Sequence, residues 1–184
     1  MERIVLAITG ASGVIYGIRT LEELSRAGYT VHLIVSESAK TILSHETEYT
    51  VDDLAAMADE NIAEDDIAAG VASGSFRCDA AVIVPCSLKT LAGIAHGYAS
   101  NAIIRMAMVT LKEGRPLVVV PRETPLDLVS LQNLVTARQA GATVLPAMPG
   151  FYHNPESIDD LVDHVVGKIL DQLDVEHGLF ERWG

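Results

Sequence analysis

Short apolar runs alternate along the chain with longer segments in which apolar residues recur at helical spacing. The apolar runs are nearly continuous, as expected for strands that are covered on both faces of a sheet, and they occupy residues 4–9, 30–35, 80–85, 116–121 and 143–145. Helical spacing is found over residues 14–26, 38–44, 51–59, 88–95, 102–113, 126–140 and 157–173. This alternation predicts an α/β fold, a parallel sheet with crossover helices.

The 184 residues contain no linker, low-complexity tract or obvious repeat, so we expect residues 1–184 to form a single domain. Pro125 and Pro155 stand where helix starts tolerate proline. The longest apolar runs are far shorter than a membrane span, and the first residues lead into a strand without a signal-like segment. We therefore expect a cytoplasmic protein with no membrane partner.

Composition and charge exclude several classes of partner and site. The formal net charge of −12 argues against nucleic acid and anionic membranes, which bind basic surfaces. The acidic surface fits adaptation to high salt and simple solubility equally well. Cys78 and Cys86 have neither zinc nor redox spacing, which indicates core or cofactor-lining thiols, and the histidines are scattered. We therefore predict no metal site.

Polar residues follow the predicted strands, at the carboxyl ends where open parallel sheets bind ligands. The first strand leads to Gly10-Ala11-Ser12-Gly13, where glycines admit a ligand to the backbone and a helix start offers N–H groups to an anion. The loop lacks the full dinucleotide pattern, so a plain turn is the alternative. After the second strand, Ser36 is either a ligand or an N-cap, and Glu37 suits a ribose hydroxyl.

The third and fourth strands end in residues that suit phosphate binding and proton transfer. Ser87, Lys89 and Thr90 supply two hydroxyl groups and a cation at the start of a predicted helix, which favours a phosphate site. Arg122 suits a phosphate or a flavin carbonyl, and Glu123 suits proton transfer. The alternative for Arg122 and Glu123 is a surface ion pair.

Further candidates for anion binding lie in other segments. Arg105 and Lys112 share one stripe of a predicted helix, although a solvated helix face is the alternative. Tyr152 lies in a Pro/Gly-rich aromatic loop and either touches a substrate or packs, and Ser73 adds a hydroxyl group before the third strand. Because an acidic chain places these cations and Lys168 in candidate site segments, we expect it to bind anions there.

Over essentially its whole length the chain resembles the flavin prenyltransferases of the UbiX type. The resemblance rests on several linked motifs in the right order: Gly10-Ala11-Ser12-Gly13 with Tyr16-Gly17, Pro85 to Gly93, Leu111-Lys112-Glu113, Pro121 to Pro125, Phe151-Tyr152-His153 with Pro155, Asp160 to Asp163, and Arg182-Trp183.

The resemblance implies a three-layer, Rossmann-like or flavodoxin-like parallel sheet with helices on both faces. It further implies an enzyme that joins a dimethylallyl group from dimethylallyl monophosphate to N5 and C6 of reduced FMN. The product, prenylated FMN, would serve UbiD-type decarboxylases. Members of the family need no metal and form homo-oligomers, typically dodecamers, with sites between subunits.

The resemblance also implies roles for individual residues. The expected FMN contacts are Gly10, Ala11, Ser12, Ser36, Ser87, Leu88, Lys89, Thr90 and Arg122. The expected ligands of the prenyl phosphate are Ser73, Arg105, Lys112, Tyr152 and Lys168. Glu46 would take the C6 proton, and Ser12 and Glu123 would relay a proton toward the leaving phosphate. Lys112 would be the fourth catalytic residue.

Two residues depart from the family pattern, and two other functions stay open. Position 168 is commonly Arg, and Lys168 keeps the charge but loses bidentate geometry. Met108 replaces a commonly acidic residue, which should leave Arg105 and Lys112 freer to bind phosphate. The alternatives are an FMN-dependent cysteine decarboxylase of the phosphopantothenoylcysteine type and a non-catalytic flavin-binding subunit. The sequence leaves open whether the donor is a monophosphate or a diphosphate.

Overall fold

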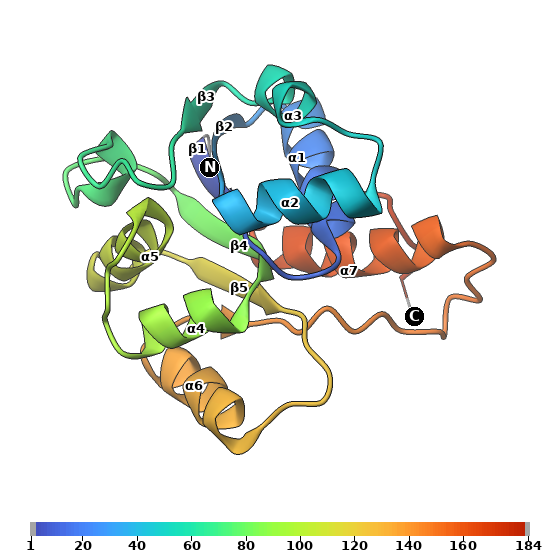
Figure 1. Ribbon diagram of the computed structural model, residues 1–184. Coiled ribbons are helices and arrows are strands. Elements are labelled where there is room, and N and C mark those ends of the chain that lie inside the picture. The colour runs from blue at the N-terminus through green and yellow to red at the C-terminus, as the bar shows by residue number, and fades with distance from the viewer. Residues whose placement is uncertain (1–2, 183–184) are drawn as a thin grey trace.

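One parallel sheet organises the computed structural model, which describes residues 3–182 and so leaves Trp183 outside the described residues. The strand order is β3-β2-β1-β4-β5-β6, and every neighbouring pair is parallel (Figure 1). The strands are β1 (Arg3–Ile8), β2 (Thr30–Val35), β3 (Glu60–Ile62), β4 (Ala80–Cys86), β5 (Leu117–Pro121) and β6 (Thr143–Val144).

Between residues 3 and 182, seven α-helices and one short 3-10 helix accompany the strands. They are α1 (Val14–Arg26), α2 (Glu37–Glu46), α3 (Val51–Met57), η1 (Gly70–Ala72), α4 (Leu88–Ala95), α5 (Ala102–Lys112), α6 (Leu128–Gln139) and α7 (Ile158–Gln172). No helix within residues 3–182 has the length and apolar character needed to cross a membrane.

The helices cover both faces of the sheet and create two cores (Figure 1). Alternate residues of β1 point to opposite faces: Ile4 and Leu6 join the core under α1, α2, α3 and α7, whereas Val5 and Ala7 join the core under α4, α5 and α6. Burial on both faces explains why the strands read as continuous apolar runs. The predicted three-layer α/β fold is confirmed.

The predicted bounds are close to the observed ones, with three corrections. Glu60–Ile62 forms an edge strand that the apolar pattern did not predict, because two of its three side chains are polar and exposed. The predicted helix over residues 126–140 begins only at Leu128, after its N-cap Asp127. Pro125 and Pro155 therefore precede the helices rather than opening them, since Ser157 is the N-cap of α7.

Candidate active site

Thr9 ties together the loops that follow β1 and β4. Its hydroxyl group donates to the carbonyl oxygen of Pro85 at 2.8 Å and accepts from the backbone N–H of Ser87 at 2.7 Å. Thr9 itself is buried. These two bonds bring the loop over residues 10–13 next to the start of α4, as predicted for ligand loops at one edge of a parallel sheet.

The same loop packs closely against the first turn of α2. A Cβ atom at Gly10 would lie 2.3 Å from Oγ of Ser38, so only glycine fits at this position. Ser36 is buried, and its hydroxyl group caps α2 by accepting from the N–H of Ala39 at 3.1 Å. Ser36 is therefore an N-cap, which is one of the two alternatives that the sequence left open. Because Ser36 also lies beside the loop, its contact with FMN stays a prediction.

The start of α4 has the donors that a phosphate group needs. Ser87 caps the helix by accepting from the N–H of Thr90 at 3.3 Å, and the two hydroxyl groups lie 3.1 Å apart. Within residues 3–182, no hydrogen bond uses the N–H groups of Leu88 and Lys89. Two N–H groups beside two hydroxyl groups at a helix start fit an anion such as the FMN phosphate.

Arg122 connects the β5 loop to the β1 loop. Its Nε donates to the carbonyl oxygen of Ser12 at 2.9 Å. Burial raises the pKa of the nearby Tyr16 phenol, and the Arg122 guanidinium opposes that rise. The Glu123 side chain is exposed and accepts from the N–H of Thr124. Among the ion pairs of the described residues, none joins Arg122 to Glu123, so the surface ion pair is not formed.

Glu46 reaches from the last turn of α2 to the start of α1. Its Oε2 accepts from the backbone N–H of Gly13 at 2.7 Å and of Val14 at 3.3 Å. Gly13 adopts the left-handed conformation with φ of 96° and has no side chain with which to cap α1. The Glu46 carboxylate therefore acts as the cap, and the favourable helix N-terminus holds it beside Ser12.

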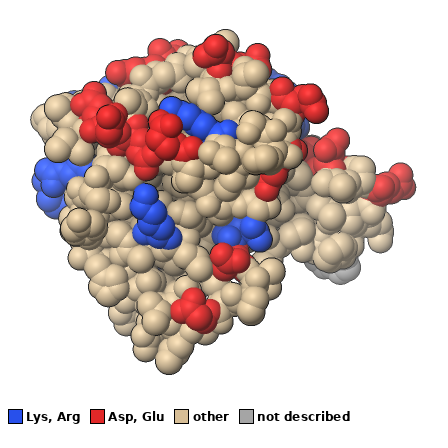
Figure 2. All heavy atoms as spheres, viewed as in Figure 1, with Lys and Arg blue, Asp and Glu red and all other residues tan. Residues whose placement is uncertain are grey.

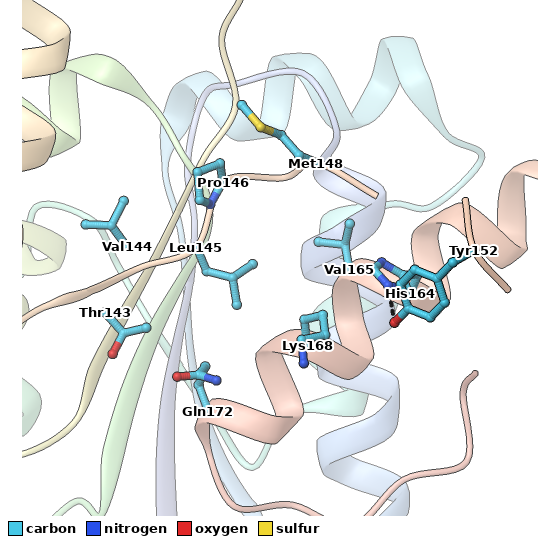
Figure 3. Close-up of a pocket in the computed structure, with 10 residues that line it drawn as sticks. All are labelled: Thr143, Val144, Leu145, Pro146, Met148, Tyr152, His164, Val165, Lys168 and Gln172. Atoms are coloured by element: carbon cyan, nitrogen blue, oxygen red, sulfur yellow. Dashed lines mark hydrogen bonds between the residues drawn. The ribbon is translucent and has the colours of Figure 1, made fainter. Parts of the chain in front are cut away.

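Tyr152 and Lys168 line a pocket of about 470 Å³ between the β6 loop and α7 (Figure 3). The Tyr152 hydroxyl group lies 3.1 Å from Nε2 of His164, and Lys168 forms an ion pair with Asp171 at 3.0 Å. Tyr152 and Lys168, two of the five candidate ligands of the prenyl phosphate, thus line the same pocket, and their contact with the phosphate stays a prediction. His164 was missed by the sequence analysis, although it precedes Lys168 by four residues and so shares its helix face.

The other three candidates for the prenyl phosphate lie elsewhere. Nε of Arg105 donates to the carbonyl oxygen of Ala72, the Ser73 hydroxyl group lies 2.9 Å from that of Ser75, and Nζ of Lys112 lies 3.2 Å from Glu113. Arg105 and Lys112 project from α5, which covers the opposite face of the sheet from α7. One chain therefore presents two separate sets of candidate phosphate ligands.

Lys112 also lies far from the Gly10 loop along the strand direction. It ends α5 five residues before β5 begins, and the next cation, Arg115, donates to the carbonyl oxygens of Gly74 and Phe76 just before β4. Lys112 is thus near the amino ends of the strands, whereas the Gly10 loop is at their carboxyl ends. A single chain does not place Lys112 beside its own predicted flavin loops.

The sequence also led to predictions about the two cysteines and about metal binding. Cys86 is fully buried, and burial raises the pKa of its thiol to about 12, as suits an inert core thiol. Cys78 is half-buried and, like Cys86, is a free thiol. Among residues 3–182, no group of three or more His, Cys, Asp and Glu side chains is placed to hold a metal ion. The metal independence of the reaction stays a prediction.

Comparisons with known proteins agree with this geometry. Residues 1–170 match the family model described as Flavoprotein. The flavin prenyltransferase LpdB of Lactiplantibacillus plantarum is 49% identical to the chain, and the alignment covers 100% of this chain and 98% of that protein.

Two solved structures are similar over the whole chain. The crystal structure of AnUbiX (PadA1) in complex with FMN and dimethylallyl pyrophosphate has a TM-score of 0.98 at 45% identity, covering 100% of this chain and 97% of that one. The dodecameric FMN-dependent UbiX-like decarboxylase from Escherichia coli O157:H7 has a TM-score of 0.97 at 44% identity, covering 100% of both chains. With these identities over its full length, the chain belongs to the family of UbiX-type flavin prenyltransferases.

Proposed function

We propose that this protein transfers a dimethylallyl group from dimethylallyl monophosphate to reduced FMN, with bonds to flavin N5 and C6. The observation that carries the proposal is the position of Glu46, whose carboxylate is held by the N–H groups of Gly13 and Val14 beside the predicted flavin loop. The similarity to AnUbiX, crystallised with FMN and dimethylallyl pyrophosphate, supports both ligands.

FMN supplies the nucleophilic ring system, and the loops at the carboxyl ends of the strands hold it. The start of α4, with Ser87 and Thr90, fits the phosphate group because its first N–H groups have no partner among the described residues. The loop over residues 10–12 approaches the ligand closely, and Arg122 fixes that loop from the other side. Ser36, Leu88 and Lys89 complete the proposed contacts.

Two subunits supply the ligands of the prenyl phosphate. Tyr152 and Lys168 on one face of the sheet, and Arg105 and Lys112 with the nearby Ser73 on the other, converge only when copies of the chain assemble. We therefore propose a homo-oligomer, and the dodecameric relative supports twelve subunits. These cations neutralise the leaving phosphate in place of a metal ion.

The acid–base steps are assigned to four side chains. Glu46 accepts the proton from C6 during ring closure, because its carboxyl group caps α1 next to the predicted flavin loop. Ser12 and the exposed Glu123 relay a proton toward the leaving phosphate, and Lys112 of a neighbouring subunit stabilises its charge. Exclusion of water by the assembled subunits protects the allylic carbocation from hydrolysis.

Residues 1–184 form a single catalytic domain in this proposal, and the product is passed to a UbiD-type decarboxylase. The experiment incubates the protein with reduced FMN and dimethylallyl monophosphate without oxygen, then adds the filtrate to an inactive UbiD-type apo-enzyme. Recovery of decarboxylation supports the assignment, whereas no recovery with active control filtrate contradicts it. No specific observation favours cysteine decarboxylation or a non-catalytic flavin-binding role.

A further inference from the structure

His164 contacts two parts of the loop that carries Tyr152. The buried imidazole, on the first half of α7, lies with Nδ1 3.1 Å from the backbone nitrogen of Gly150 and with Nε2 3.1 Å from the Tyr152 hydroxyl oxygen (Figure 3). The two ring nitrogens thus hold the loop at two points, and the ring faces the pocket lined by Tyr152 and Lys168.

The Gly150 contact decides which tautomer His164 adopts. A backbone N–H is only a donor, so Nδ1 must accept and cannot carry a proton. A neutral imidazole then has its proton on Nε2, which donates to the Tyr152 oxygen. Since that oxygen accepts from His164, the phenolic proton of Tyr152 is directed to a different acceptor.

The surroundings of His164 keep the ring neutral and fixed. Burial is the largest cause that lowers the pKa of His164, and the charges of His153 and Lys168 lower this pKa further. The His153 ring stacks on it with centroids 4.9 Å apart and planes 6° apart, and Phe180 packs against it at 4.9 Å. Asp171, with its partners His177 and Arg182, lies two helical turns further along α7.

We propose that His164 is a positioning residue that orients the Tyr152 hydroxyl group, as its Nε2–H donates to the phenolic oxygen and so directs the phenolic proton toward the phosphate of the prenyl donor. The inference rests on the proposed function only in taking Tyr152 as a ligand of that phosphate. It assigns to His164 no contact with the substrate.

Protonation of the ring would undo this arrangement. A proton on Nδ1 would face the N–H of Gly150, and the two donors would separate. The affinity for the donor should therefore decline as the pH falls through the pKa of His164, below the ordinary histidine value of 6.5. The titratable groups that face the ring are His153, Lys168 and Tyr152, so the pH profile is compared with that of a His164 variant.

The test separates the two ring nitrogens with His164→Gln and His164→Asn. The Gln amide can replace the Nε2–H donor to Tyr152, whereas the shorter Asn can replace only the Nδ1 acceptor of Gly150. Steady-state kinetics with dimethylallyl monophosphate should show KM raised roughly three- to tenfold in His164→Asn and in Tyr152→Phe, the loss expected for one hydrogen bond. His164→Gln should remain within about twofold of the wild type.

The double variant tests whether His164 acts through Tyr152. His164→Asn should add nothing to KM in a Tyr152→Phe background, and it should abolish the decline of affinity below pH 6.5. Two outcomes would overturn the inference about His164 but not the proposed function. One is that the effects of His164→Asn and Tyr152→Phe on KM add fully in the double variant. The other is that Tyr152→Phe raises KM while His164→Asn leaves it unchanged. An unchanged KM in Tyr152→Phe would overturn both the inference and the proposed role of Tyr152.

A readout without substrate keeps the inference falsifiable if a variant misfolds. Long-range ¹⁵N–¹H spectra of the wild-type protein labelled at histidine should show the neutral tautomer with its proton on Nε2 of His164. A proton on Nδ1 would overturn the inference whatever the kinetics show. His96→Asn is the matched control, because it removes a histidine hydrogen bond of 3.0 Å to Asn133 on the other face of the sheet and should leave KM unchanged.

Discussion

The Oε2 atom of Glu46 lies 2.7 Å from the backbone nitrogen of Gly13. Because Gly13 adopts a left-handed conformation and has no side chain, the carboxylate replaces the side-chain cap that α1 lacks. One contact thus joins the end of α2 to the loop predicted to hold the flavin. It gives Glu46 a fixed place beside that loop.

Substitution of Glu46 by Gln should separate catalysis from binding. The amide keeps the size of the side chain and an oxygen that caps α1, but it cannot accept the C6 proton. We expect kcat to fall at least about a hundredfold, the lower range for a general base, while the FMN dissociation constant stays within about threefold. Flavin fluorescence and single-turnover kinetics measure the two quantities. Glu48→Gln, an exposed neighbour, is the control, and full activity of Glu46→Gln would remove Glu46 from the mechanism.

Restoring the family's usual Arg at position 168 should tighten binding of the prenyl donor. Arg offers two parallel N–H groups to a phosphate, whereas Lys168 offers one point charge that it shares with Asp171 at 3.0 Å. We expect Lys168→Arg to lower KM roughly three- to tenfold and Lys168→Met to lower kcat/KM by about tenfold or more. Lys40→Arg is the control, because Lys40 also forms an i,i+3 ion pair on a helix, and it should change neither KM nor kcat/KM. Equal KM values for Lys and Arg would contradict a bidentate advantage.

Much of the fold is predictable from the sequence because burial on both faces makes each central strand a continuous apolar run. The bounds of α1, β2 and α4 agree with their patterns residue by residue. The edge strand β3 is not predictable in this way, since a three-residue strand with two exposed polar side chains has no periodicity. Periodicity also does not reveal the order of the strands.

The candidate site is predictable only in part. Ser87 and Thr90 meet at a helix start as predicted, because a helix that follows a strand begins at the carboxyl edge of the sheet. The separation of Lys112 from Lys168 was not predicted, since it depends on which face each crossover helix covers. His164 was missed because a lone histidine on a helix gives no signal until its partners are known.

The stability of the C-terminal segment should depend on pH through Asp171. Burial opposes its ionisation, but hydrogen bonds from Arg182, Lys168 and His177 outweigh burial and hold the pKa of the carboxyl at about 2, below the ordinary 3.8. A carboxyl with a lowered pKa stabilises the folded state above the unfolded pKa and loses this effect as the pH falls toward the folded pKa.

Asp171→Asn should therefore cost stability at pH 6, with the difference from the wild type shrinking between pH 4 and pH 2. Urea unfolding at several pH values measures the free energy of unfolding. Asp174→Asn is the control, because Asp174 is exposed with φ of 55°, a conformation that Asn adopts equally well. A constant difference between wild type and Asp171→Asn across this pH range would contradict the prediction.

The exposed side of α6 should mediate contact between copies of the chain. Leu128, Leu131 and Val135 are 69%, 45% and 57% exposed on one helix stripe, next to Val129. In Figure 2 acidic side chains gather over α2 and α3, whereas the surface around α6 is largely uncharged, which reduces repulsion between acidic subunits.

Replacing Leu131 and Val135 by Asp should therefore dissociate the oligomer without unfolding the subunit. Native mass spectrometry measures the subunit number, and circular dichroism checks the fold. The control is Ile67→Asp, which places one such negative charge at an exposed apolar residue distant in sequence from α6. An oligomer that survives the double substitution would exclude this side of α6 as an interface.

The mass of the flavin tests the central claim most directly. The protein is incubated without oxygen with reduced FMN and either dimethylallyl monophosphate or the diphosphate, and the flavin is extracted for mass spectrometry. We predict that the mass of FMN increases by that of one five-carbon prenyl group with the monophosphate. An unshifted flavin with both donors would contradict the assignment of this protein as a flavin prenyltransferase.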